Sequence, residues 1–156
     1  MPPNASLAKK GMRGDRFFVD TNVILYTYDI TNPHKRERAE MWLQWLWENA
    51  AGSLSWQVLQ EFYWNAVGKF GANPQIVRSH VAFLTNWNPP DITLGLLERA
   101  WFWTDAAQIT FWDAMIVAAA ERIRCRWLLT EDFQTGRAFG TITVVNPFQK
   151  SPSEVI

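Results

Sequence analysis

Short strand-like runs alternate with helix-like segments along most of this 156-residue chain. The strand-like runs are rich in aromatic and β-branched residues, and helical spacings of apolar residues separate them. Because two parallel strands are joined by a crossover that is usually a helix, this alternation predicts a parallel-sheet α/β sandwich. The runs are "FFVD" (17–20), "SLSW" (53–56), a short one at Asp91–Thr93, "CRWLLT" (125–130) and "TITVVNPF" (141–148).

The helices are predicted from apolar spacing and from residues typical of helix ends. After a short helix at about 23–28, the longest helix carries apolar residues at three- and four-residue spacing, and we expect Gly52 to end it. Trp42 and Trp45 share its apolar face, which predicts burial and leaves Trp47 as a candidate anchor for a bound helix. Further helices are expected after "SLSW", from about Pro74, up to Trp103 and from Thr110 or Phe111.

Composition excludes several classes of protein. Fifteen Lys and Arg residues balance fifteen Asp and Glu residues, so no global positive charge indicates a nucleic-acid partner. The longest apolar run, 114–120, is too short to span a bilayer. A lone Cys125 suits a reducing compartment, and we expect a cytoplasmic protein with no membrane contact. Residues 1–15 lack the apolar segment of a secretory signal, and we interpret them as a mobile leader.

Four acidic residues are predicted to meet at one end of the sheet. Asp20 ends the first strand-like run, Asp132 follows the run 125–130, Asp113 opens the helix before that run, and Glu61 lies on the helix after "SLSW". Open parallel sheets place their ligand crevice at the carboxyl ends of the strands. Clustered carboxylates raise one another's pKa, and a divalent cation removes that conflict. Ligation by oxygen alone favours Mg²⁺ or Mn²⁺ over zinc.

Each acid also has an interpretation without a metal. Asp113 is equally suited to stabilise a helix N-terminus through the helix dipole, and Asp132 to occupy the turn "TEDFQTG". Glu61 is alternatively a solvated helix position, although Phe62 and Tyr63 beside it make this less attractive. Asp20 is the hardest to explain without a partner, because burying an unpaired carboxylate costs several kcal/mol or more.

Five sequence blocks together resemble those of a known family. In chain order, the blocks are "FFVDTNVILYTYD", "SWQVLQEFYW", "TFWDAMIVAAAE", "LLTEDFQTG" and "VVNPF". They resemble the blocks of PIN-domain ribonucleases, most closely the VapC-type toxins of bacterial toxin–antitoxin pairs. The resemblance implies a three-layer α/β/α sandwich with a central parallel sheet of about four to five strands. It also implies one nuclease domain over 16–148, which leaves a C-terminal tail at 149–156.

The same resemblance implies the site and its partners. The metal-binding acids are then Asp20, Glu61, Asp113 and Asp132, with Asn22 and Thr130 as polar helpers. One or two Mg²⁺ or Mn²⁺ ions, an RNA substrate, a homodimer and a small antitoxin that blocks the site are implied as well. From the residues alone, Asn22 is also a good helix cap and Thr130 a good strand former. We leave Glu131 out of the metal ligands, since adjacent side chains on an extended segment face opposite ways.

The predicted function is therefore that of a metal-dependent endoribonuclease with a toxin role. The alternatives are an RNA-processing or decay nuclease of the same fold and a non-catalytic module that binds RNA or protein. A complete set of acids favours catalysis, because a pure binder of a polyanion gains nothing from four carboxylates. Phosphates could meet the basic patches at 34–38 and 122–126 or the side chains of Lys69 and Arg78, although solvated helix ends explain these equally well.

Overall fold

The computed structural model describes residues 16–156, and the predicted leader lies outside the described residues. Within 16–156 we find no helix with both the length and the apolar character needed to cross a membrane. The elements in chain order are β1 (Phe17–Val19), α1 (Thr21–Leu25), η2 (Tyr26–Tyr28), α2 (Pro33–Glu48), β2 (Gly52–Ser53), α3 (Trp56–Gly68), α4 (Pro74–Leu84), η3 (Thr85–Trp87), α5 (Leu94–Ala107), α6 (Phe111–Arg122), β3 (Trp127–Leu129), β4 (Ala138–Phe139), β5 (Ile142–Val145) and η4 (Pro152–Glu154).

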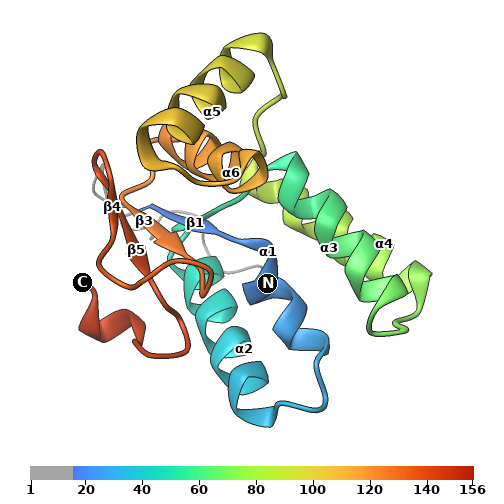
Figure 1. The fold of residues 1–156 in the computed structure, drawn as a ribbon. Helices are drawn as coiled ribbons and strands as arrows, with labels where there is room; N and C mark the ends of the chain where they lie inside the picture. The colour runs from blue at the N-terminus through green and yellow to red at the C-terminus, as the bar shows by residue number, and fades with distance from the viewer. Residues whose placement is uncertain (1–15) are drawn as a thin grey trace, which may run out of the picture.

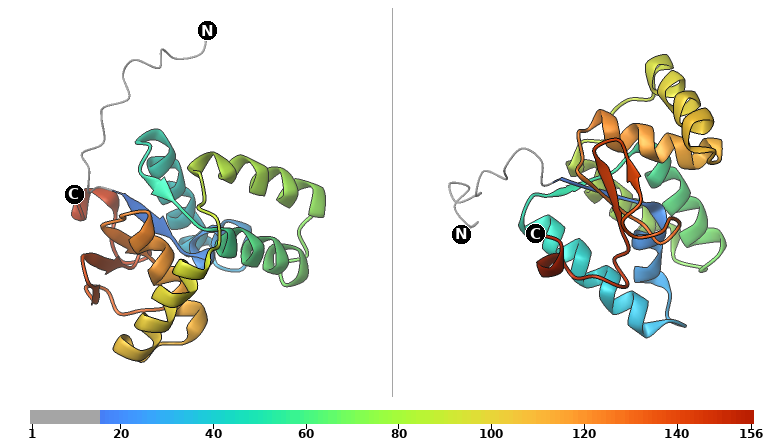
Figure 2. Two further views of the ribbon diagram at one scale, coloured as in Figure 1. Left: turned by 90° about the horizontal axis from the view of Figure 1, so that it is seen from above. Right: turned by 60° about the vertical axis from the view of Figure 1, so that its left-hand side comes forward.

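The strands form one mixed sheet in the order β2-β1-β3-β5-β4. β1 pairs in parallel with β2 and β3, and β3 pairs in parallel with β5, while β4 is an antiparallel edge strand on β5. Helices α5 and α6 cover one face of the sheet and α2 covers the other (Figures 1 and 2). The predicted three-layer α/β/α sandwich is confirmed.

Two different kinds of packing hold the layers together. On one face, residues 114–120 of α6 are buried on every side, because this helix lies between the sheet and α5. On the other face, the centroid of the Phe17 ring lies 5.4 Å from that of the Trp42 ring and 5.7 Å from that of the Trp45 ring. Both tryptophans are on α2. The Trp42 indole N–H also donates to the carbonyl oxygens of Pro147 and Lys150, at 3.1 and 2.9 Å. The chain after β5 is thereby fixed to α2.

Some sequence-based boundaries were wrong. Asp91–Thr93 is not a strand, because Thr93 caps α5 by accepting a hydrogen bond from the Leu96 N–H. Helix α5 continues past Trp103 to Ala107, and the two-residue strand β4 was missed. Gly52 does not end α2; that helix ends at Glu48, and Ala50 takes the left-handed conformation after it, with φ of 50°.

Gly52 has a different role, at the edge of the sheet. It pairs with Phe17, and the Trp87 ring of η3 packs directly against its Cα. A Cβ at this position would lie 2.6 and 2.7 Å from two atoms of that ring, which is closer than Cβ atoms approach other groups. The absence of a side chain therefore lets η3 close over β2.

We predict that Gly52→Ala lowers the free energy of unfolding by about 1–3 kcal/mol, because the new methyl group must displace the Trp87 indole. Urea denaturation followed by circular dichroism measures the change. Gly68→Ala is the matched control, since a Cβ at Gly68 meets nothing within 4 Å. The loss should shrink in a Trp87→Ala background. An equal loss with and without the Trp87 indole would contradict this account of Gly52.

Candidate active site

The register of β1 and β3 places Asp20 beside Thr130. Val19 is paired with Leu129, and each strand is followed directly by one of these two polar residues. The Asp20 N–H continues the ladder by donating to the Leu129 carbonyl at 3.0 Å. The Thr130 hydroxyl then donates to Asp20 Oδ2 at 2.8 Å, and the Thr21 N–H donates to Asp20 Oδ1 at 2.7 Å. Both oxygens of this buried carboxylate are thus held, one by the residue that follows β3 and the other by the first residue of α1.

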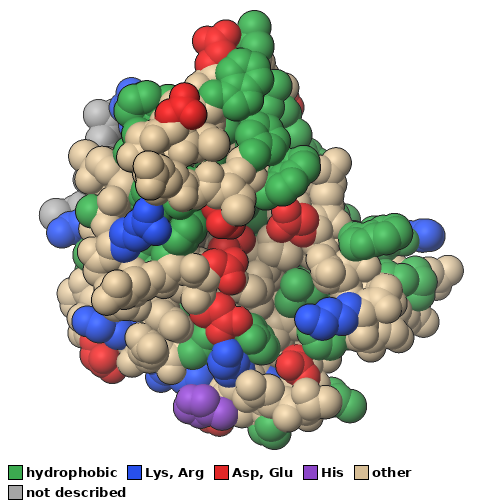
Figure 3. Space-filling model, viewed as in Figure 1, with side chains coloured by type: hydrophobic (Ala, Val, Ile, Leu, Met, Phe, Trp, Pro, Cys, Tyr) green, Lys and Arg blue, Asp and Glu red, His purple; other side chains and the backbone are tan. Residues whose placement is uncertain are grey.

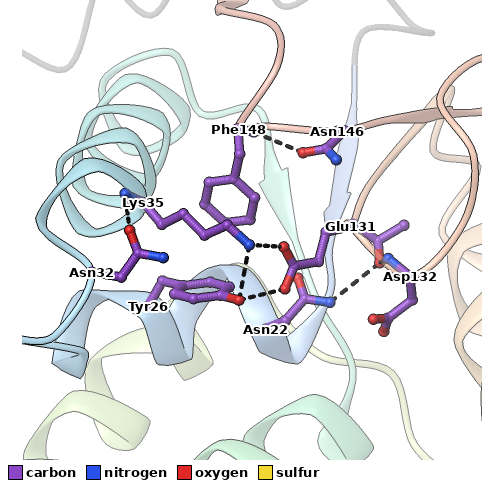
Figure 4. Close-up of polar contacts among 9 residues, drawn as sticks. Asn22, Tyr26, Asn32, Lys35, Glu131, Asp132, Asn146 and Phe148 are labelled. Atoms are coloured by element: carbon purple, nitrogen blue, oxygen red, sulfur yellow. Dashed lines mark hydrogen bonds and ion pairs between the residues drawn. The ribbon is translucent and has the colours of Figure 1, made fainter.

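The Thr130 hydroxyl also connects two other predicted site residues. It accepts a hydrogen bond from the Asp132 N–H at 3.0 Å and one from the Asn22 side-chain amide at 3.4 Å. Figure 4 shows Asn22 reaching from α1 toward the segment that carries Asp132. Thr130 and Asn22 therefore connect the chain around Asp20 to that around Asp132.

Glu61 reaches the same region from α3. Its Oε2 accepts a hydrogen bond from the Thr21 hydroxyl at 2.7 Å, and its Oε1 accepts one from the Gln57 amide at 2.9 Å. Gln57 lies one helical turn earlier and also donates to the Trp112 carbonyl, at 3.2 Å. The Glu61 carboxylate is therefore held between α1 and α3, and Gln57 links α3 to the first turn of α6.

Asp113 comes from that first turn of α6, which Thr110 caps by accepting a hydrogen bond from the Asp113 N–H at 3.2 Å. Together with Asp20, Glu61 and Asp132, it lines one cleft of about 210 Å³, which we call the acidic cleft. Figure 3 shows carboxylates gathered in a band down the middle of this hollowed face. Four distant segments thus bring their acids to one place.

The charges in the acidic cleft repel one another. The pKa of Asp20 is raised from its ordinary value to about 7, mainly by burial and also by the charges of Asp132 and Glu61, while hydrogen bonds from Thr130 and Thr21 oppose the rise. The pKa of Asp132 is also raised, first by desolvation and then by the charges of Asp113 and Glu131, although hydrogen bonds with Asp20 and Asn22 oppose this. The cluster therefore carries an electrostatic cost that a cation would relieve.

Glu131 points away from the acidic cleft. Its two oxygens accept hydrogen bonds from the Tyr26 hydroxyl and from Lys35 Nζ, each at 2.6 Å (Figure 4). It therefore has a cationic partner of its own, whereas Asp132 beside it faces the other acids. The adjacent side chains of Glu131 and Asp132 thus have different surroundings, and the exclusion of Glu131 from the metal ligands remains a prediction.

The residues of the cleft have the chemistry to hold a divalent cation. Besides the carboxylates, Asn22 and Gln57 line the cleft, and each has a buried amide oxygen that accepts no hydrogen bond. Within residues 16–156, however, no three His, Cys, Asp or Glu side chains stand close enough together to hold a metal as they are. Asp132 is exposed and Asp113 is half-buried at the rim of the cleft.

A family model places this arrangement among known proteins. The model of the PIN domain matches residues 17–138, which is more than half of the chain and includes all six predicted site residues. The chain belongs to the PIN-domain family. PIN domains are generally nucleases, and those nucleases generally use divalent metal ions. No curated protein matches this PIN domain significantly. The boundaries at 16–148 and 149–156 remain predictions.

Two residues that position Glu61 were missed in the sequence. Neither Thr21 nor Gln57 was predicted to be a site residue. The available signal was the spacing of Gln57 and Glu61, because residues four apart on a helix lie on the same face. The contact between Thr21 and Glu61 had no such signal, since it joins segments forty residues apart.

We predict that Thr130→Val lowers the free energy of unfolding by about 1–3 kcal/mol, because the buried Asp20 carboxylate loses a donor and the Asp132 N–H loses its acceptor. Thr130→Ser keeps the hydroxyl and is the matched control. Urea denaturation in EDTA measures both variants without any metal contribution. Equal free energies of unfolding for Thr130→Val and Thr130→Ser would show that the Thr130 hydroxyl has no role in stabilising this PIN-domain cleft.

Proposed function

We propose that this protein is a Mg²⁺- or Mn²⁺-dependent endoribonuclease that hydrolyses RNA phosphodiester bonds in the acidic cleft. The observation that carries the proposal is the convergence of four carboxylates from β1, α3, α6 and the loop after β3 on one open cleft. Desolvation, together with the charges of the neighbouring acids, raises the pKa of both Asp20 and Asp132, and this is the cost expected of a site built to bind cations.

In this proposal Asp20, Glu61, Asp113 and Asp132 hold the ion or ions. A divalent cation bound there supplies the Lewis acidity that activates a water molecule and stabilises the charge developing on the phosphate oxygens. Thr130 keeps Asp20 directed into the cleft by its hydrogen bond to Oδ2. Asn22, whose buried amide oxygen has no hydrogen-bond partner, is placed to orient a water or phosphate group.

The cleft favours catalysis over a pure binding role. A module that only held RNA would meet the polyanion with cations, yet the acidic cleft is lined by four carboxylates and, among the described residues, by Lys69 as the sole cation. Such a cleft attracts a phosphodiester only when metal ions reverse its charge. The alternative of a non-catalytic binder therefore requires an explanation for every one of these acids.

We propose further that the protein is a VapC-like toxin with a small cognate antitoxin, a homodimeric state and a cytoplasmic location. Aromatic side chains support a partner: the exposed Trp47 and Phe83 and the half-buried Trp87 line an apolar hollow of about 270 Å³ between α2 and the α4–η3 segment. Leu94 and Trp101 leave an apolar face on α5, which suits contact with a second copy. An RNA-processing or decay nuclease of the same fold is the alternative. A small adjacent reading frame encoding an antitoxin would favour the toxin role.

We predict that Asp20→Asn abolishes Mn²⁺-dependent cleavage of a single-stranded RNA while the protein stays folded. Asparagine keeps the shape and can still accept from the Thr21 N–H, but it removes a charge needed to bind the cation. Glu131→Gln is the matched control, because it neutralises a neighbouring acid that is paired with Lys35. Gel electrophoresis of the products measures cleavage, and circular dichroism checks the fold.

Three results would contradict the proposed function. One is wild-type turnover by folded Asp20→Asn protein. Another is undiminished cleavage in excess EDTA. The third is a loss of cleavage in Glu131→Gln as complete as that in Asp20→Asn, since the essential charge would then not be confined to the acidic cleft.

A further inference from the structure

A second hollow opens directly beside the acidic cleft. It has a volume of about 510 Å³, within the range of ligand-binding clefts, and lies between η2 with its following turn and the end of α3. Phe70, Tyr26 and Tyr28 contribute to its walls, and we call it the aromatic hollow. Asn22, Leu25 and Lys69 line both this hollow and the acidic cleft. A strand whose phosphate lies in the acidic cleft therefore continues naturally into the aromatic hollow.

Lys69 is a cationic residue that lines both the acidic cleft and the aromatic hollow. Among the described residues that line either one, it alone is cationic, and its side chain is exposed. Lys35 is close by but is bound to Glu131, so it neutralises the acid on that wall. Asp29 is a further acid of the hollow, and its carboxylate accepts hydrogen bonds from the N–H and hydroxyl of Thr31. Lys69 is thus the group available to meet a phosphate entering the hollow.

The aromatic rings that line the hollow differ in how they are packed. The Tyr26 ring packs against Phe148 with centroids 4.8 Å apart, and its hydroxyl donates to Glu131. The Tyr28 hydroxyl contacts His80 Nδ1 at 3.1 Å. Phe70, in contrast, is half-buried and, within the described chain, is not one of the side chains packed against the core. Its ring lies 5.6 Å from Lys69 Nζ.

We propose that the aromatic hollow binds the nucleotide adjacent to the scissile phosphate, with Lys69 on its phosphate and Phe70 stacked on its base. This proposal rests on the proposed ribonuclease function and names a subsite for its substrate. A base can stack on Phe70 only when it is unpaired, because a duplex keeps its bases stacked on one another. The subsite therefore selects single-stranded RNA without reading its sequence.

Two variants test the two contacts separately. Lys69→Gln removes a phosphate contact, so the slope of log Kd against log[NaCl] for a single-stranded oligoribonucleotide should decrease in magnitude by about 0.7. Phe70→Ala should leave that slope unchanged and weaken binding roughly tenfold. Fluorescence anisotropy of a labelled oligoribonucleotide, with Ca²⁺ in place of Mn²⁺, measures both effects. Neither variant should change the affinity for the same RNA in a duplex.

Lys150→Gln and Phe102→Ala are the matched controls, since both side chains are exposed and line neither space. The subsite is overturned if Lys69→Gln and Phe70→Ala bind the single strand as the controls do, or if the wild type binds no single-stranded RNA. Cleavage in Mn²⁺ is measured in parallel. A wild type that binds in this Phe70-dependent way but does not cleave would refute the proposed function and leave the nucleotide subsite supported.

Discussion

A carboxylate placed at the end of a buried parallel strand is the constraint on which the rest of this structure depends. Asp20 cannot be buried without compensation, and the fold provides it through the Thr21 N–H and the Thr130 hydroxyl. Thr130 is available only because β1 and β3 are paired in register, Val19 with Leu129. The pairing of β1 with β3 therefore also sets the orientation of the Asp20 carboxylate.

The other acids add a cost that the fold does not remove. Glu61 is held by Thr21 and Gln57, while Asp132 and Asp113 stand at the open rim of the acidic cleft. Asp20 and Glu61 are thus each held by two donors, whereas Asp132 is the exposed carboxylate of the four. On the other side of the loop, Glu131 is neutralised by Lys35, which separates the acidic cleft from the surface around Tyr26.

The sequence predicted the features that depend on local pattern. The alternation of strands and helices was enough for a parallel-sheet α/β sandwich, and the resemblance to PIN-domain ribonucleases implied its three layers. The position of Asp20 and Asp132 after parallel strands was enough to bring them to one edge. It failed where a distant contact decides the outcome. Gly52 was taken as a helix end because nothing local shows that Trp87 packs on it. Thr93 was placed in a strand although its hydroxyl caps α5. Lys69 was a candidate phosphate contact in the sequence, but its position beside the aromatic hollow depends on α3 ending opposite η2, which no spacing reveals.

The central claim is that these acids form one divalent-cation site, and Mn²⁺ located by anomalous diffraction tests it most directly. In a crystal soaked with Mn²⁺, the account predicts an anomalous peak in the acidic cleft, bonded to a carboxylate oxygen of Asp20 and to oxygens of at least two of Glu61, Asp113 and Asp132. Glu131 should stay bonded to Lys35. The account would be contradicted by a protein that cleaves RNA in Mn²⁺ but shows its only anomalous peaks outside this cleft.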